Sequence, residues 1–265
     1  MEKIKSEKDN VNLFWTGGWD STFQLLQLLL VYRRQVIPYY IIDPDRRSLG
    51  KEIQTMKNIK ADLFKKFPFT KSLLKPTKYY AITDITLDKE IENAIVLIRK
   101  EKHIGEQYYW LASFCKEHNI HDMQLALEYH PTFDESHINI DPIITQSFDG
   151  YQNVFRIDPK ISETEVYKVF RYFSFPIASI TKLQMLEIAN KKGWRAIMDI
   201  TWFCHDPTCS NKPCGKCIPC RQVIKEGMGW RIPLYRRIIS YFYTRSVLPV
   251  KIFLVKKRII NKIWK

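Results

Sequence analysis

Five of the six cysteines of this chain lie within seventeen residues near its C-terminal end. The last three are spaced three residues apart, and Gly215 and Pro219 bend the backbone around them. Thiolates at this spacing converge on one metal ion, and a fourth ligand completes a tetrahedron. We predict a structural zinc site, closed because four thiolates leave no open position, with the ligands Cys204, Cys214, Cys217 and Cys220.

The remaining cysteines have other expected roles. Cys209 is either a free thiol or a replacement for Cys204 as the fourth ligand, and His205 is a weaker rival. Cys115 falls on the apolar side of an expected helix, so we place it in the core. Clustered cysteines behind a charged N-terminal segment without a secretory signal are typical of a reducing compartment, so we expect a cytoplasmic protein.

Size and charge narrow the possibilities further. A chain of 265 residues with 45% hydrophobic residues holds one large domain, or one domain with an appendage. Its longest apolar stretch, 23–32, falls short of the roughly 20 residues that cross a bilayer. The net charge of +14 is uneven, since residues 227–265 contain ten Lys and Arg and no Asp or Glu.

Apolar runs alternate with helical patterns along the first two thirds of the chain. This alternation predicts an α/β fold with a doubly wound parallel sheet. Residues 129–160 look irregular, and Ser162 with Glu165 fits a capping box. The expected strands are 11–15, 35–42, 79–82 and 123–127, and the expected helices are 20–33, 50–67, 89–102, 105–118, 162–172 and 181–192.

A glycine loop joins the first expected strand to the first expected helix. Glycines let a backbone approach an anion, and a helix N-terminus offers free N–H groups there. Hydroxyls add donors, and Asp20 can cap the helix or help to hold Mg²⁺. The alternative is a tight turn before a capped helix. The residues concerned are Thr16, Gly17, Gly18, Trp19, Asp20, Ser21 and Thr22.

This loop resembles the PP-loop, SGGxDS, of the ATP pyrophosphatase superfamily, with Thr16 in place of the first serine. It matches neither the Walker P-loop nor the dinucleotide fingerprint. Within the superfamily, residues 11–228 are most similar to 7-cyano-7-deazaguanine synthases. Besides the loop, the similar segments are Asp43-Pro44-Asp45-Arg46-Arg47 with Gly50-Lys51-Glu52, Ile180-Thr181-Lys182, Thr201-Trp202-Phe203-Cys204, and Cys214-Gly215-Lys216-Cys217-Ile218-Pro219-Cys220-Arg221.

The resemblance implies a PP-loop fold, ATP and Mg²⁺ as cofactors, and a 7-deazaguanine-like substrate. A carboxylate would be activated as its adenylate with release of pyrophosphate, ammonia would attack it, and a second activation would give the nitrile. The implied catalytic residues are Asp20, Ser21 and Lys182, although Lys182 also fits an ordinary helix start. The loop residues would bind the nucleotide together with Asp43, Arg46 and Gly105, where Arg46 also fits a solvated position and Gly105 a simple helix entry.

The chain departs from the family pattern after its fourth strand. The family has a Tyr-Pro-Asp-Cys-Arg element there, whereas this chain has 128–135, which lacks the final Cys-Arg. His130, Asp134 and His137 follow that strand and are substrate-side candidates. The departure favours a paralogue with another acceptor, as in relatives from anti-phage defence operons, while nitrile synthesis stays open.

Two other functions remain to be weighed. Sulfur transfer to tRNA is another PP-loop chemistry, and it requires a reactive cysteine, for which Cys209 is the candidate. A nucleotide-binding scaffold in a defence complex would bind ATP without releasing pyrophosphate. We divide the chain into a nucleotide-binding α/β domain (1–200), a zinc-binding segment (201–228) and a basic amphipathic tail (229–265).

The tail combines cationic and apolar residues at helical spacing. Ile252, Val255, Ile259 and Ile263 share one side. Three partners fit this pattern: a protein or a second copy of the chain, an anionic membrane surface, and nucleic acid. The aromatic content of the tail favours a protein or lipid interface over a contact with phosphates alone.

Overall fold

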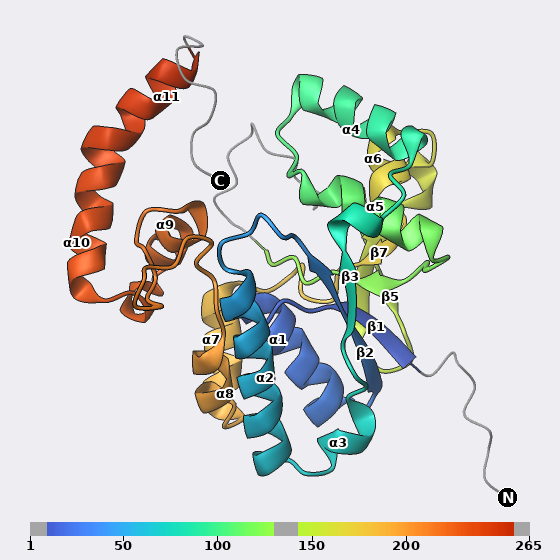
Figure 1. Cartoon of the computed structure of the whole chain (residues 1–265). Coiled ribbons are helices and arrows are strands. Elements are labelled where there is room, and N and C mark those ends of the chain that lie inside the picture. Colours follow the sequence, from blue (N-terminus) through green and yellow to red (C-terminus); the bar gives the residue numbers. More distant parts are fainter. Residues whose placement is uncertain (1–9, 130–142, 257–265) are drawn as a thin grey trace, which may run out of the picture.

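A five-stranded parallel sheet forms the centre of the protein (Figure 1). The structure, a computed structural model, describes residues 10–129 and 143–256. The strands run in the order β3-β2-β1-β4-β7, so the predicted parallel α/β fold is confirmed. They are β1 (Asn10–Phe14), β2 (Gln35–Ile42), β3 (Lys78–Ala81), β4 (Met123–Gln124) and β7 (Phe173–Ser174).

Helices cover both faces of this sheet (Figure 1). Side chains of β1 alternate between the faces, with Val11 and Leu13 in one core and Phe14 in the other. The first core lies under α1 (Trp19–Leu26), α2 (Leu49–Lys66), α7 (Lys182–Lys191) and α8 (Arg195–Ile200). The second lies under α4 (Lys89–Glu101), α5 (Gln107–Glu117) and α6 (Glu165–Phe170).

The first expected helix ends in an unusual way, because α1 continues as a π-helical turn over Gln27–Val31. Arg33 follows in a left-handed conformation with φ of 54° and lies outside the helix. A short helix, α3 (Thr70–Leu73), connects α2 to the edge strand β3.

The region expected to be irregular contains a hairpin. Strands β5 (Ile144–Phe148) and β6 (Asn153–Ile157) pair in antiparallel fashion, with Gly150 at a φ of 81° in the turn. The expected helix 162–172 is shorter than predicted and is followed by β7. The substrate-side candidates His130, Asp134 and His137 lie outside the described residues.

The predicted capping box of Ser162 and Glu165 is wrong. Asp158 caps a 3-10 turn over Pro159–Ile161, and Ser162 ends that turn. Thr164 is the N-cap of α6, and its hydroxyl accepts a hydrogen bond from the backbone of Tyr167. Because Ser162 ends the 3-10 turn that begins at Pro159, it cannot also be the N-cap of α6. A true capping box occurs at α7, formed by Thr181 and Gln184.

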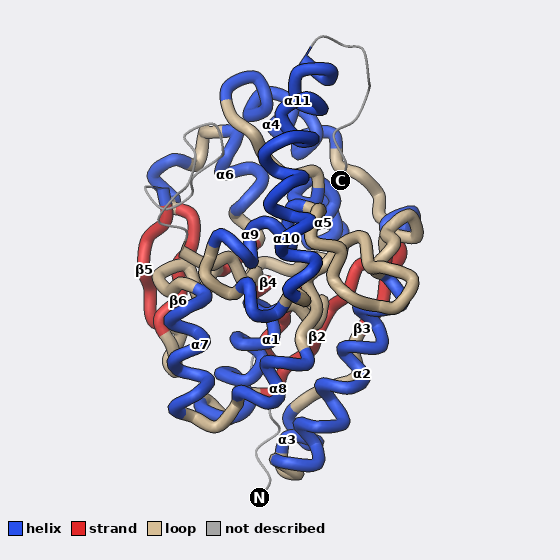
Figure 2. Tube along the Cα trace, turned by 90° about the vertical axis from the view of Figure 1, so that its left-hand side faces the viewer, coloured by secondary structure: helices blue, strands red, loops and turns tan. Residues whose placement is uncertain are grey.

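The C-terminal part leaves the sheet and forms an outer arm (Figures 1 and 2). After α9 (Ile218–Lys225) come a 3-10 turn (Gly229–Arg231), α10 (Leu234–Phe242), a π-helical turn (Tyr243–Val247) and α11 (Leu248–Lys256). Ile259 and Ile263 lie outside the described residues. The arm helix, Leu234–Val255, is by length and composition apolar enough to cross a membrane. The expectation that 23–32 is the longest apolar stretch is therefore wrong. Arg and Lys residues interrupt the apolar run of the arm, so the sequence shows no continuous apolar segment there.

Candidate functional site

A cavity of about 450 Å³ opens at the carboxyl ends of β1 and β4. The chain continues from β1 to β2 on one side of the sheet and reaches β4 on the other, so the winding direction reverses between β1 and β4. Ligands of open parallel α/β sheets bind at this switch point, and the cavity has the volume of a small-molecule site. The β1–α1 loop lines one side, and Ala126, Leu127 and Glu128 line another.

Both loop glycines occupy positions that restrict a side chain. Gly17 has a φ of 73°, and a Cβ there would lie 3.1 Å from Cγ of Met56. Its carbonyl accepts a hydrogen bond from the backbone N–H of Trp202 at 3.0 Å. Gly18 donates to Oγ1 of Thr16 at 3.3 Å and starts α1 without a side-chain cap. The loop therefore presents bare backbone at the N-terminus of α1.

Three consecutive side chains of the loop carry unsatisfied polar atoms. Nε1 of Trp19, Oδ1 of Asp20 and Oγ of Ser21 are buried and have no hydrogen-bond partner among the described residues. Buried polar groups are normally paired, because leaving one unpaired costs about 1–3 kcal/mol. Such a run at the mouth of the switch point indicates a ligand site.

Lys182 stands at the centre of three carboxylates. Its Nζ contacts Glu128 in a short ion pair and lies 3.3 Å from Oε2 of Glu226 and 3.7 Å from Oδ2 of Asp20. Burial raises the pKa of Asp20, Lys182 and Arg231 lower it, and Glu226 raises it. Burial prevails, so the negative charge of Asp20 is only partly compensated and a further cation is favoured there.

Arg46 and Arg231 supply further positive charge. Arg46 contacts Glu52 at 3.4 Å, and Glu52 also accepts from Oη of Tyr40 at 2.8 Å. Arg231 lies over the ring of Trp19 and donates to the backbone carbonyl of Thr201 at 2.6 Å. Burial lowers the pKa of Arg231 to about 10, which still leaves the guanidinium charged near neutral pH.

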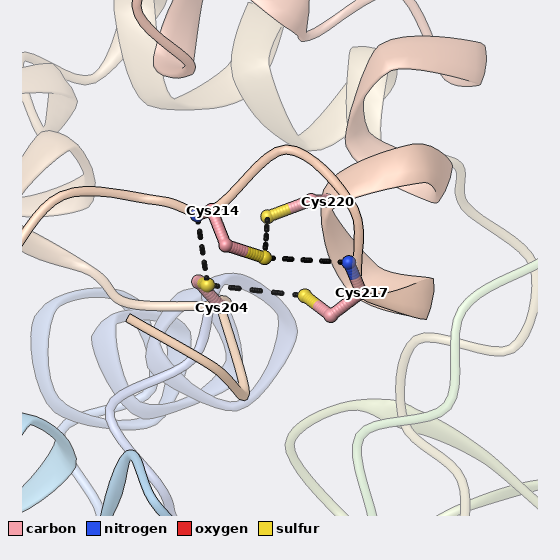
Figure 3. A group of neighbouring side chains, drawn as sticks. All are labelled: Cys204, Cys214, Cys217 and Cys220. Carbon is pink, nitrogen blue, oxygen red and sulfur yellow. Dashed lines mark hydrogen bonds between the residues drawn. The ribbon is translucent and has the colours of Figure 1, made fainter. Parts of the chain in front are cut away.

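The four predicted cysteine ligands converge on one point (Figure 3). Their sulfur atoms all lie within 4.8 Å of one another and are buried, with Sγ of Cys217 at 3.8 Å from Cys204 and Cys214 at 3.9 Å from Cys220. Zinc–sulfur bonds of about 2.3 Å define a tetrahedron with edges of about 3.8 Å. The cluster therefore has the dimensions of a metal site.

Backbone groups support this cluster. The N–H groups of Cys214 and Cys217 donate to Sγ of Cys204 and Cys214 at 3.2 and 3.3 Å. Such bonds orient thiolate ligands and partly neutralise their charge. Gly215 turns between them with a φ of 78°, and a Cβ there would lie 2.5 Å from the carbonyl oxygen of Arg236. Cys209 is exposed and lies outside the cluster.

The cluster holds one wall of the cavity. Trp202, Phe203 and His205 flank its first cysteine and line the cavity, and Nε1 of Trp202 donates to the carbonyl of Cys204 at 2.7 Å. Helix α9 begins after Cys217 and contains Cys220, and it presents Gln222, Val223 and its C-cap Glu226 to the same space. Burial lowers the pKa of His205, aided by Arg46, so its imidazole is held neutral.

The structure brings most of the predicted loop and helix residues together. Thr16, Gly18, Trp19, Asp20, Arg46 and Lys182 line the cavity, and Gly17 and Ser21 adjoin them in the chain. Three others are not among its lining residues. Thr22 accepts from Nε1 of Trp15 at 3.0 Å, Asp43 accepts from the backbone of Asp45, and Gly105 precedes α5, whose Gln107 and Tyr108 reach the cavity. Arg47 is exposed and pairs with Asp206.

Several cavity residues escaped sequence reasoning. Only Glu128 carried a usable signal, because it follows a predicted strand. Glu226 and Arg231 lie beyond the cysteines and reach the cavity through the fold of that segment. Trp202 and Phe203 belong to a segment that resembles the synthase family, but the sequence assigns them no role in a site. In comparisons with known proteins, the chain matches no protein-family model and no curated protein sequence.

Proposed function

We propose that this protein is an ATP-dependent, carboxylate-activating ligase of the PP-loop type, similar to 7-cyano-7-deazaguanine synthase. The observation that carries the proposal is the run of unsatisfied polar atoms on Trp19, Asp20 and Ser21, at the start of a helix and at the switch point of the sheet. A triphosphate supplies the acceptors that the N–H of Trp19 and the O–H of Ser21 lack, and the helix N-terminus favours its negative charge.

The chain's residues fit nucleotide and Mg²⁺ together. The backbone at Gly18 and the hydroxyls of Thr16 and Ser21 would bind phosphate oxygens. Oδ1 of Asp20 is a buried carboxylate oxygen without a partner among the described residues, so Asp20 would hold Mg²⁺. When bound, Mg²⁺ would offset charge on the phosphates.

The proposed reaction begins with attack by a substrate carboxylate oxygen on the α-phosphorus of ATP. The bond from that phosphorus to the bridging oxygen breaks, giving an acyl adenylate and pyrophosphate. Lys182 and Arg46 provide positive charge in the same cavity for the leaving group. Ammonia then displaces AMP to give an amide, and a second ATP activates the amide oxygen, so that loss of AMP leaves a nitrile. Another nucleophile in place of ammonia would give a conjugate.

The proposed substrate is a 7-deazaguanine carboxylate. The sequence resemblance suggests it, and the cavity offers aromatic surfaces for a planar heterocycle. Trp202 and Phe203 stack with ring centroids 6.1 Å apart and an interplanar angle of 25°, and Tyr108 also lines the cavity. Glu128 and Glu226 would accept hydrogen bonds from ring N–H groups.

We further propose that the cysteine cluster holds Zn²⁺ as a structural ion. Four buried thiolates at the edge lengths of a zinc tetrahedron support this assignment. The ion would fix Trp202, His205 and α9 as the cavity wall, and it would take no part in the chemistry because its coordination is complete.

The test uses purified, metal-loaded full-length protein. Calorimetry measures Mg-ATP affinity, and exchange of labelled pyrophosphate into ATP, with 7-carboxy-7-deazaguanine present, reports adenylate formation. Mass spectrometry with and without ammonia identifies the product. No affinity for Mg-ATP would refute the proposal as a whole, whereas affinity without exchange for this acid would leave the scaffold function in its place.

Sulfur transfer is the weaker alternative. The only candidate thiol outside the metal cluster and the core is Cys209, which is exposed and absent from the cavity lining. Cys209→Ser should therefore leave pyrophosphate exchange unchanged. Loss of activity in Cys209→Ser would restore that alternative.

A further inference from the structure

Helix α10 is oriented with its apolar side outward. Its exposed side chains recur at helical spacing and are between 47% and 64% exposed: Leu234, Tyr235, Ile238, Tyr241 and Phe242. On the opposite side Ser240 is 4% exposed, and Arg236 and Arg237 are partly buried. A surface helix of a soluble domain normally buries its apolar stripe and exposes its polar face. The reversed orientation indicates that something apolar covers α10.

The apolar surface continues along the arm. Beyond α10, Val247, Val250 and Ile252 are exposed on the π-helical turn and α11. The helix Leu234–Val255 has 22 residues and therefore spans about 33 Å. We call the exposed apolar residues from Leu234 to Ile252 the arm surface. An exposed patch of this length and composition marks an interaction site.

A basic pocket lies beside the arm surface. It has a volume of about 550 Å³ and lies between α9 and the arm. Its charged lining residues are all cationic: Arg221, Lys225, Arg237 and Arg245. Ile218 and Ile224 line the same space, so the pocket combines apolar walls with cationic groups. This combination matches the headgroup and upper acyl region of an anionic lipid.

We propose that the arm surface docks the protein onto an anionic lipid bilayer, with the arm helix lying in the plane of the interface. Residues 227–265 contain ten Lys and Arg and no Asp or Glu, which complements a negatively charged leaflet. Tyr and Phe on the outer face of α10 have the apolar bodies that interfacial helices insert between headgroups.

The same features disfavour other occupants. A second copy docking through this surface would bring two basic, acid-free segments together, and their charges would repel. Nucleic acid would need an outer face rich in cations, whereas the outer face of α10 is mostly apolar and aromatic, and Arg245 of the following π-helical turn lies over the ring of Tyr241. Crossing the bilayer would carry Arg245, near the middle of the segment, into hydrocarbon, which is unfavourable. The in-plane orientation leaves Arg245 and Lys251 at headgroup depth.

The test is co-sedimentation of the full-length protein with vesicles of phosphatidylcholine alone or mixed with phosphatidylglycerol. The test variant is Ile238→Glu with Phe242→Glu, at positions 52% and 61% exposed. The matched control is Val96→Glu with Leu97→Glu on α4, at 51% and 42% exposed, which adds the same charge and removes similar apolar surface. Leu234→Glu is a second, single test variant, and melting temperatures confirm that each variant folds.

We expect wild type and the α4 control to bind mixed vesicles at least tenfold more tightly than neutral ones. Both arm variants should lose at least tenfold in affinity for mixed vesicles. Absence of wild-type binding to anionic vesicles, or equal binding by folded arm variants, would overturn the proposal. Dimerisation that requires Ile238 and Phe242 without lipid affinity would assign the surface to a second copy. Resistance to alkaline carbonate extraction would overturn the in-plane orientation. None of these outcomes depends on ATP binding.

Discussion

Replacing Asp20 by Asn should stabilise the folded protein at neutral pH. Oδ1 of Asp20 is buried and lacks a partner among the described residues, and burial raises the pKa of this carboxyl. Lys182 keeps Glu128 and Glu226 when the charge of Asp20 is removed. The neutral amide of asparagine has nearly the same shape as the carboxylate. The substitution therefore removes a buried charge that destabilises the folded protein when no ligand is bound.

The expected gain is about 1 kcal/mol. The amide still buries an oxygen, so the gain comes only from removing the charge, whose desolvation costs several kcal/mol, and the lost attraction to Lys182 at 3.7 Å offsets most of it. For a chain of this size, 1 kcal/mol corresponds to a rise of about 2–4 °C in melting temperature. Because the folded-state pKa of Asp20 is raised, the penalty is complete above that pKa and absent below the ordinary value of 3.8. The advantage of Asp20→Asn should therefore shrink on acidification.

Melting temperatures of both proteins, measured from about pH 8 down to about pH 4, close to the ordinary pKa of 3.8 for an aspartate, test this reasoning. Ser21→Ala is the matched control, because it removes a neighbouring unsatisfied oxygen that does not titrate. Its effect should not vary with pH. A destabilised Asp20→Asn variant at pH 7, or a difference from wild type that stays constant with pH, would refute the argument. The same variant should bind Mg-ATP at least tenfold more weakly, an exchange of stability for function.

Three further changes test the site. Gly18→Ala adds a Cβ 3.2 Å from Oγ1 of Thr16 at an ordinary φ, so calorimetry should show at least tenfold weaker Mg-ATP binding, with stability changed by less than about 1 kcal/mol. The control Gly50→Ala, which has open space around its Cβ, should leave the affinity for Mg-ATP unchanged. Cys217→Ser should lose the bound zinc in metal analysis and melt at a lower temperature, and Cys209→Ser should retain both properties. Lys182→Met uncovers buried carboxylates and should lose about 3–5 kcal/mol in urea unfolding; a loss below about 1 kcal/mol would contradict the ion cluster.

Local patterns were sufficient for the features that depend on neighbours in sequence. The parallel sheet follows from alternating apolar runs, and the convergence of four cysteines follows from their spacing. The loop at Gly17 and Gly18 was found because its glycines have a local conformational reason. The cysteine and glycine signals each lie within a segment of about twenty residues, and the sheet is indicated by a series of such local signals along the chain.

Features built by distant contacts escaped prediction. Lys182 meets Glu128 across 54 positions, and Arg231 meets Thr201 across 30, so neither contact has a local signature. The capping box predicted at Ser162 does not form, because two other residues cap this short segment. Asp158 caps the 3-10 turn that Ser162 ends, and Thr164 caps α6. For the tail, periodicity groups Ile252 and Val255 on one side of a helix but cannot show which side of the arm the protein covers.

The tight approach of Gly215 to the carbonyl of Arg236 links the cysteine loop directly to the first turns of α10. No side chain larger than hydrogen fits between them without displacing backbone. Tilting or pulling of the arm would therefore reach the four cysteines, and through them Trp202 and α9. If the arm binds a membrane as proposed, that contact at Gly215 would couple membrane binding to the shape of the cavity.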